Sequence, residues 1–149
     1  MATLKSDIYA TQSATGTGDN RVDGRLLAGK VRQANATITL SDEASGNSIA
    51  LVQLPTGCLI DPAQSFVQCE DPATTAFLAE VGVPSDTDAL TPADLDIKDG
   101  GKVFFDTALG APLYAVAAGD EVVSMLCNTI TGLIVGADVR VCITYIDYN

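Results

Sequence analysis

The sequence predicts an all-β protein: a single β-sandwich or jelly-roll-like domain of seven to eight short strands, preceded by an extended N-terminal arm. Apolar and polar residues alternate in many short runs, which are separated by turns rich in Gly, Pro, Asn and Asp. One helix start is visible in 149 residues, at Thr91 and Pro92. Short strands with almost no helix favour a sandwich, jelly roll or barrel over a parallel sheet with crossover helices. We expect the arm over residues 1–30 and the domain over residues 31–149, because the alternation begins there.

The first thirty residues contain little that could enter a core. Residues 13–24, SATGTGDNRVDG, are typical of an extended or flexible leader. Residues 1–32 hold five basic and three acidic side chains, a net +2, while residues 33–149 hold three and sixteen, a net −13. The five basic residues are Lys5, Arg21, Arg25, Lys30 and Arg32. A terminus without a binding role would show the same pattern, so composition alone leaves both interpretations open.

The first third of the domain alternates as half-buried strands do. Residues 31–40, VRQANATITL, place Ala, Ile and Leu on one face and Asn and Thr on the other. Residues 48–54, SIALVQL, form a second strand that stops at a Pro-Thr-Gly turn. Residues 58–60 and 64–69 predict a strand interrupted near Asp61 and Pro62, because proline donates no ladder hydrogen bond.

The middle of the chain is rich in prolines and acidic residues. We expect a long loop here, with a short strand or turn at residues 77–81 and a helical turn near residues 92–97. The stretch around Asp94, Asp96 and Asp99 suggests a loose calcium site. It fails the EF-hand spacing, which puts a glycine where Asp99 stands, so a solvated acidic loop is favoured.

Four more strands are predicted before the chain ends, in the segments KVFFD, APLYAVAA, DEVVSMLC and DVRVCITYID. If the last two form a hairpin that turns between Ile134 and Val135, Cys142 faces Cys127. The core face would then hold Val122, Leu126, Val141 and Ile143, and the opposite face Val123, Met125, Cys127, Cys142 and Ile146. An apolar opposite face should be covered, either by the edge of a second sheet or by a partner subunit.

Composition argues against catalysis. There is no histidine, which removes the commonest general base and metal ligand, and no nucleotide-binding or nucleophile motif is present. The cysteines stand singly, at positions 58, 69, 127 and 142, so buried free thiols are favoured over a zinc site. A net charge of −11 argues against nucleic acid and anionic membranes. We expect no cofactor and no metal. The start of the chain has no signal-like apolar stretch, so we expect synthesis in a reducing cytoplasm.

The order of features resembles the capsid decoration, or cement, proteins of tailed bacteriophages. The likeness rests on the start MATLKSDIYATQ, the Asn-Arg pair, L-x-G-K-V-R before a Thr-rich strand, LVQLPTGCLI, and V-x-V-x-I-x-Y in the last strand. The resemblance implies a non-enzymatic, commonly trimeric β-sandwich that binds the major capsid protein on the virion exterior. It also implies that the five basic residues named above contact the capsid or a neighbouring subunit.

Two other functions stay open at this stage. A tail or fibre component could use a β-sandwich to bind a carbohydrate, but such sites use aromatic platforms, and aromatics make up 5% of the chain, with no Trp. A hydrolase that uses two carboxylates ranks below both, because nothing marks a particular pair among the 19 acidic residues.

Overall fold

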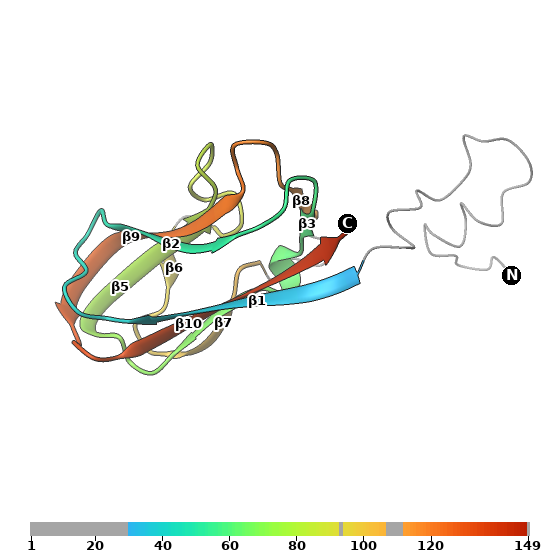
Figure 1. Cartoon of the computed structure of the whole chain (residues 1–149). Helices are drawn as coiled ribbons and strands as arrows, with labels where there is room; N and C mark the ends of the chain where they lie inside the picture. The colour runs from blue at the N-terminus through green and yellow to red at the C-terminus, as the bar shows by residue number, and fades with distance from the viewer. Residues whose placement is uncertain (1–29, 93, 107–111, 149) are drawn as a thin grey trace, which may run out of the picture.

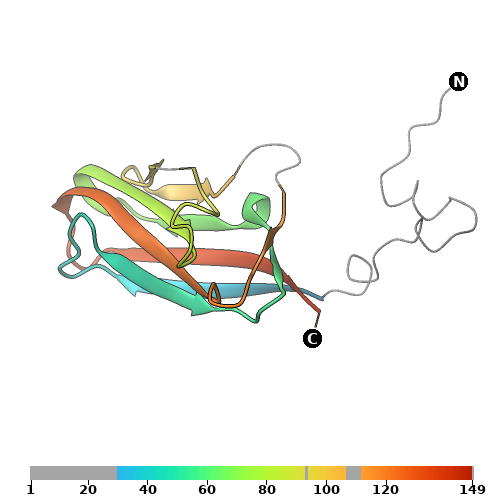
Figure 2. The ribbon, with the colours of Figure 1, turned by 90° about the horizontal axis from the view of Figure 1, so that it is seen from above.

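The computed structural model describes residues 30–92, 94–106 and 112–148, which form two packed β-sheets (Figures 1 and 2). The strands are β1 (Lys30–Thr39), β2 (Ser48–Gln53), β3 (Leu59–Ile60), β4 (Phe66–Cys69), β5 (Ala73–Gly82), β6 (Leu95–Asp96), β7 (Gly101–Phe104), β8 (Tyr114–Ala115), β9 (Val122–Leu133) and β10 (Asp138–Asp147). A 3₁₀ turn, η2 (Pro62–Gln64), lies between β3 and β4. In the described ranges, no helix is long and apolar enough to span a membrane.

Strand β10 organises the six-stranded sheet. Along one edge it pairs with all ten residues of β1, from Lys30 opposite Asp147 to Thr39 opposite Asp138. Its other edge is shared between β4 and β3, which pair in turn with β7 and β8. The four-stranded sheet has the order β2-β9-β5-β6, and every pairing in both sheets is antiparallel. The prediction of an all-β sandwich or jelly-roll-like domain is confirmed.

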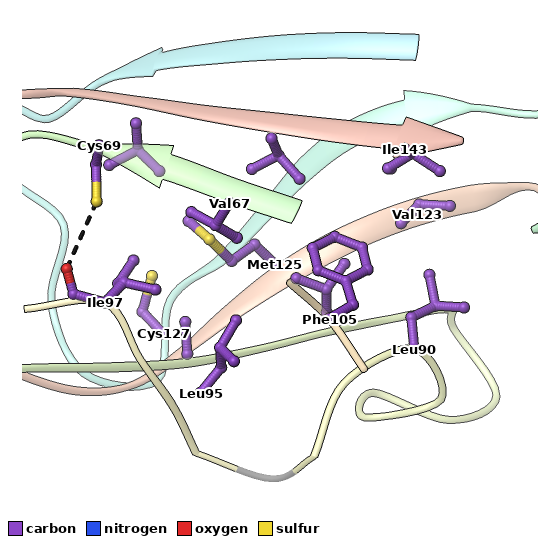
Figure 3. Packing of buried hydrophobic residues seen from close by; sticks show 14 of the residues in the cluster. Val67, Cys69, Leu90, Leu95, Ile97, Phe105, Val123, Met125, Cys127 and Ile143 are labelled. Carbon is purple, nitrogen blue, oxygen red and sulfur yellow. Dashed lines mark hydrogen bonds between the residues drawn. The ribbon is translucent and has the colours of Figure 1, made fainter. Parts of the chain in front are cut away.

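The core lies between the two sheets. Alternate residues of β10 point inward, as do alternate residues of β9, because successive strand residues face opposite sides. Figure 3 shows Met125 and Val123 of β9 meeting Ile143 and Val67 of the other sheet, with Phe105 beside them. The connecting segments add Leu90, Ile97 and Phe105 to this core, and Cys69 Sγ lies 3.5 Å from the carbonyl oxygen of Ile97.

The interruption predicted near Asp61 and Pro62 is present. Asp61 caps η2, accepting a hydrogen bond from the backbone N–H of Ala63 at 3.1 Å. Ser65 donates its hydroxyl proton to the carbonyl oxygen of Asp61 (2.7 Å), and Ser65 Oγ accepts a hydrogen bond from Thr144 N (3.0 Å). Ser65 therefore satisfies the backbone of β10 at the point where its neighbour changes from β4 to β3.

The long loop predicted for the middle of the chain is wrong in part, because the short strand or turn predicted at residues 77–81 belongs to a longer strand. Residues 73–82 form the ten-residue strand β5, with Phe77 fully buried in the core. The predicted helical turn at residues 92–97 is also wrong, because Leu95–Asp96 form β6 and pair with β5. Thr91 Oγ1 accepts a hydrogen bond from Val81 N at 2.8 Å, so this side chain satisfies a strand instead of capping a helix.

The predicted hairpin of the last two strands is wrong as well. β9 pairs with β2 and β5, and β10 pairs with β1 on one edge and β4 and β3 on the other, so each lies inside a different sheet. The link between them crosses from one sheet to the other. It is held at the end of β1 by hydrogen bonds from Gly136 N to Leu40 O (2.7 Å) and from Leu40 N to Ala137 O (2.9 Å).

The prediction of which side chains point into the core is wrong for β9 and right for β10. Val123, Met125 and Cys127 point into the core, while Val122 and Leu126 point outward and are half-buried, the reverse of the prediction. Val141 and Ile143 of β10 lie in the core, as predicted. Cys127 and Cys142 therefore do not face one another.

Candidate assembly surface

The five basic residues singled out from the sequence divide into two groups. Lys5, Arg21 and Arg25 lie outside the described residues. Lys30 and Arg32 lie at the start of β1, where the chain enters the domain. Arg32 Nε is 3.0 Å from Asp147 Oδ2, and the Asp147 side chain is only 11% exposed. Arg32 therefore ties the start of β1 to the end of β10.

The outward face of the six-stranded sheet carries a group of aromatic and basic side chains that the sequence did not reveal. Register places Arg140, Gln68 and Lys102 in one row across β10, β4 and β7. The next row holds Cys142, Phe66 and Phe104 on the same strands. Directly opposed residues share a face. We define the aromatic–basic patch as Phe66, Gln68, Lys102, Phe104 and Arg140.

Lys102 is held over both rings of the patch. Its Nζ lies 3.7 Å from the ring centroid of Phe66 and 4.9 Å from that of Phe104. The two rings meet edge to face, with centroids 5.9 Å apart and an interplanar angle of 67°. The face of an aromatic ring attracts a cation, so these contacts fix the position of the ammonium group at the surface.

Arg140 is also held in place. Its Nη2 and Nε donate to Asn35 Oδ1 of the neighbouring strand, at 2.9 and 3.3 Å. Five basic and sixteen acidic residues belong to the described ranges. The ion pairs found within those ranges are Arg32 with Asp147 and Lys98 with Asp99. Lys102 and Arg140 thus have no carboxylate partner in this part of the chain.

Cys142 lies in the same row as Phe66 and Phe104, on the outward face of β10. It is 1% exposed in a single chain, and its register neighbours are Asn35 and Phe66. The thiol is therefore buried within a single chain, and cover of this face by a partner subunit stays a prediction. Burial raises the pKa of the Cys142 thiol, and the charges of Arg140 and Lys102 oppose that effect.

All four thiols are free and buried. Burial raises the pKa of Cys58, Cys69 and Cys127 to about 11, because the anionic form loses its hydration. They stay protonated at neutral pH and are packing groups of low reactivity.

A second apolar row crosses the same face near the point where the chain enters β1. Val31 lies opposite Ile146, which lies opposite Leu59, with Ala115 beyond it on β8. Val31 is 70% exposed. The outward face of the six-stranded sheet therefore presents apolar side chains in two rows, separated by the covered Thr144.

The outward face of the four-stranded sheet has the opposite character. Asn128 Nδ2 donates to Glu80 Oε2 at 3.0 Å and to Asp94 Oδ1 at 3.1 Å, so two carboxylates share one amide. Asp96 accepts from Lys98 N, and Asp99 pairs with Lys98 Nζ. Each of the three aspartates that suggested a calcium site thus contacts a protein donor: Asp94 the amide of Asn128, Asp96 the backbone N–H of Lys98, and Asp99 the ammonium group of Lys98. No group of three or more His, Cys, Asp or Glu that could hold a metal occurs in the described segments.

Two hollows lie in the surface formed by the described residues. One of about 410 Å³ borders the patch and is lined by Gln68, Cys69, Glu70, Gly136, Ala137, Asp138 and Arg140. Another of about 80 Å³ lies beside Gly82, Pro84 and Leu126. The first is an open extension of the patch, and the second has room for little more than water.

No protein-family model matches the chain, and no curated protein sequence matches it. Solved structures do share its fold. A chain of the cyanophage Pam1 capsid asymmetric unit matches with a TM-score of 0.54, 15% identity and coverage of 91% of both chains. A chain from the capsid of Ralstonia phage GP4 matches with a TM-score of 0.56 and 18% identity over 82% of this chain and 87% of that one.

A third match comes from the acidic stable capsid structure of the Helicobacter pylori bacteriophage KHP30, with a TM-score of 0.52 and 17% identity over 78% of this chain and 86% of that one. All three structures are phage capsids. At these identities the likeness shows that the fold is shared, from near one end of the domain to the other.

Proposed function

We propose that this protein is a non-enzymatic structural component of a phage particle, which decorates the outer surface of the major capsid protein shell as a homotrimer. The observation that carries the proposal is the end-to-end fold match to chains of three phage capsids. The motifs at both ends of the sequence, compared above with decoration proteins, support it independently.

The physical character of the domain supports a binding role. Its core is apolar and its thiols are protonated packing groups. Asp61, Asp96 and Asp147 take part in a cap, a turn and an ion pair. What it does present is a broad sheet face with fixed aromatic and basic side chains. Such a face suits recognition of another protein, because fixed side chains lose little entropy on binding.

A tail or fibre protein that binds carbohydrate is the second candidate, and the pair formed by half-buried Phe66 and exposed Phe104 favours it. Sugars stack on open ring faces. Lys102 Nζ lies 3.7 Å above the Phe66 ring centroid, so one ring face is occupied by a cation. This arrangement favours a protein partner over a sugar.

Purified protein should bind shells of its own phage that were assembled without it, with saturation at a fixed number of copies. Co-sedimentation over a concentration series measures this. The control is the same shell already carrying its full complement of the protein, which should bind none. A chain that stays in the supernatant at every concentration would contradict the proposed function.

A further inference from the structure

We infer that the aromatic–basic patch is the surface through which the folded domain docks onto an acidic, partly apolar region of the shell protein. The inference rests on the proposed function and adds the site and the chemistry of the partner. The arm would supply one contact and the patch a second.

The charges of the patch are the first argument. The described part of the domain has eleven more acidic than basic residues, yet Lys102 and Arg140 pair with none of the acidic side chains described there. The row that contains both cations is Thr37, Arg140, Gln68 and Lys102, the next row is Asn35, Cys142, Phe66 and Phe104, and neither row holds a carboxylate. A carboxylate brought to these two rows therefore meets two cations. The nearest acidic side chains, Glu70 and Asp138, line the hollow at the other side of Arg140.

The geometry is the second argument. Lys102 is held by two rings and Arg140 by Asn35, so neither cation must be ordered on binding. The guanidinium has five N–H donors, and the contacts described here direct Nε and Nη2 to Asn35. The remaining donors can bind a carboxylate. Phe104, on the edge strand β7, is 37% exposed and adds apolar area to the site.

The position of the patch is the third argument. Val31 and Ile146 lie on the same face, about 13 Å away along β10 at the usual rise of a strand. The 29 residues that precede β1 join the domain at this end. A segment joined to the domain at this end and a patch on this face can engage one surface together, and linked contacts strengthen one another. The opposite sheet carries Glu80 and Asp94 and would be repelled by acidic groups.

The test compares charge reversals at matched positions in the full-length protein. Lys102→Glu and Arg140→Glu should each weaken binding to protein-free shells at least tenfold in co-sedimentation. Lys98→Glu makes the same change of charge at a lysine paired with Asp99 outside the patch, and it should change binding less than twofold. Lys102→Gln and Arg140→Gln should lose less than the reversals, and their thermal unfolding identifies any variant that fails to fold.

The outcomes separate the two proposals. Wild-type protein that binds no shells overturns the proposed function and, with it, this inference. Wild-type binding that Lys102→Glu and Arg140→Glu leave unchanged overturns the inference alone. Loss of the oligomer in light scattering, with shell binding per copy unchanged, would assign the patch to contacts between copies and would also overturn it.

Discussion

Replacing Phe105 by alanine should lower the free energy of unfolding by about 3–5 kcal/mol, the usual cost of truncating a fully buried phenylalanine. Phe105 is 0% exposed and packs between the two sheets beside Met125 (Figure 3). Its backbone N–H also donates to Ser65 O at 2.9 Å, so neighbouring backbone cannot move freely to fill the space. Denaturant unfolding of the wild type and the variant measures the loss.

Phe104→Ala is the matched control, because the two phenylalanines are adjacent in the chain but face opposite sides. Phe104 is 37% exposed and contacts Phe66 and Lys102 on the outward face. Its truncation should cost no more than about 2 kcal/mol, since an aromatic pair and an exposed cation–π contact are each worth about 1 kcal/mol. Equal destabilisation by the two variants would contradict the assigned facing of these residues.

Deleting residues 2–24 should leave a folded domain that no longer binds shells. The deletion removes Lys5 and Arg21 but keeps Arg25, and it leaves the Arg32–Asp147 ion pair intact. Thermal unfolding should therefore stay close to that of the full chain. Binding should be lost because the patch alone lacks the second, linked contact.

Salt provides an independent check on the arm. Binding by the full chain should weaken as salt increases, since exposed charges are screened beyond about 10 Å at 0.1 M. A full-length variant with Lys5, Arg21 and Arg25 replaced by glutamine should show weaker binding and a smaller salt dependence. If the truncated protein bound shells as fully as the whole chain, the arm would have no role in binding.

Local pattern predicted most strands because their alternation is a short-range property. The run at β1 alternates strictly, those around β2, β4 and β10 are short runs rich in β-branched and apolar residues, and the structure has strands at all four. β5 was predicted only as a short strand or turn at residues 77–81, because its residues are buried toward its second half on both faces, which hides the two-residue period. Thr91 and Pro92 suggested a helix, but the threonine hydroxyl serves the backbone of β5.

Pairing between strands could not be predicted in the same way. The register proposed for β9 and β10 assumed that strands adjacent in sequence are neighbours in a sheet, whereas the connecting turn crosses the sandwich. The aromatic–basic patch depends on pairings of β4 with β7 and β10, which are far apart in sequence. Its residues occur in predicted strands, but nothing local shows that Lys102 lies above Phe66.

Imaging of the particle tests the central claim most directly. Cryo-electron microscopy of wild-type particles, compared with particles whose gene for this protein is deleted, should show extra density on the outer surface of the shell. That density should contain three copies of the β-sandwich around a threefold position and should be absent from the deletion particles. Density confined to the tail or to the inside of the shell, or no difference between the two maps, would contradict the account.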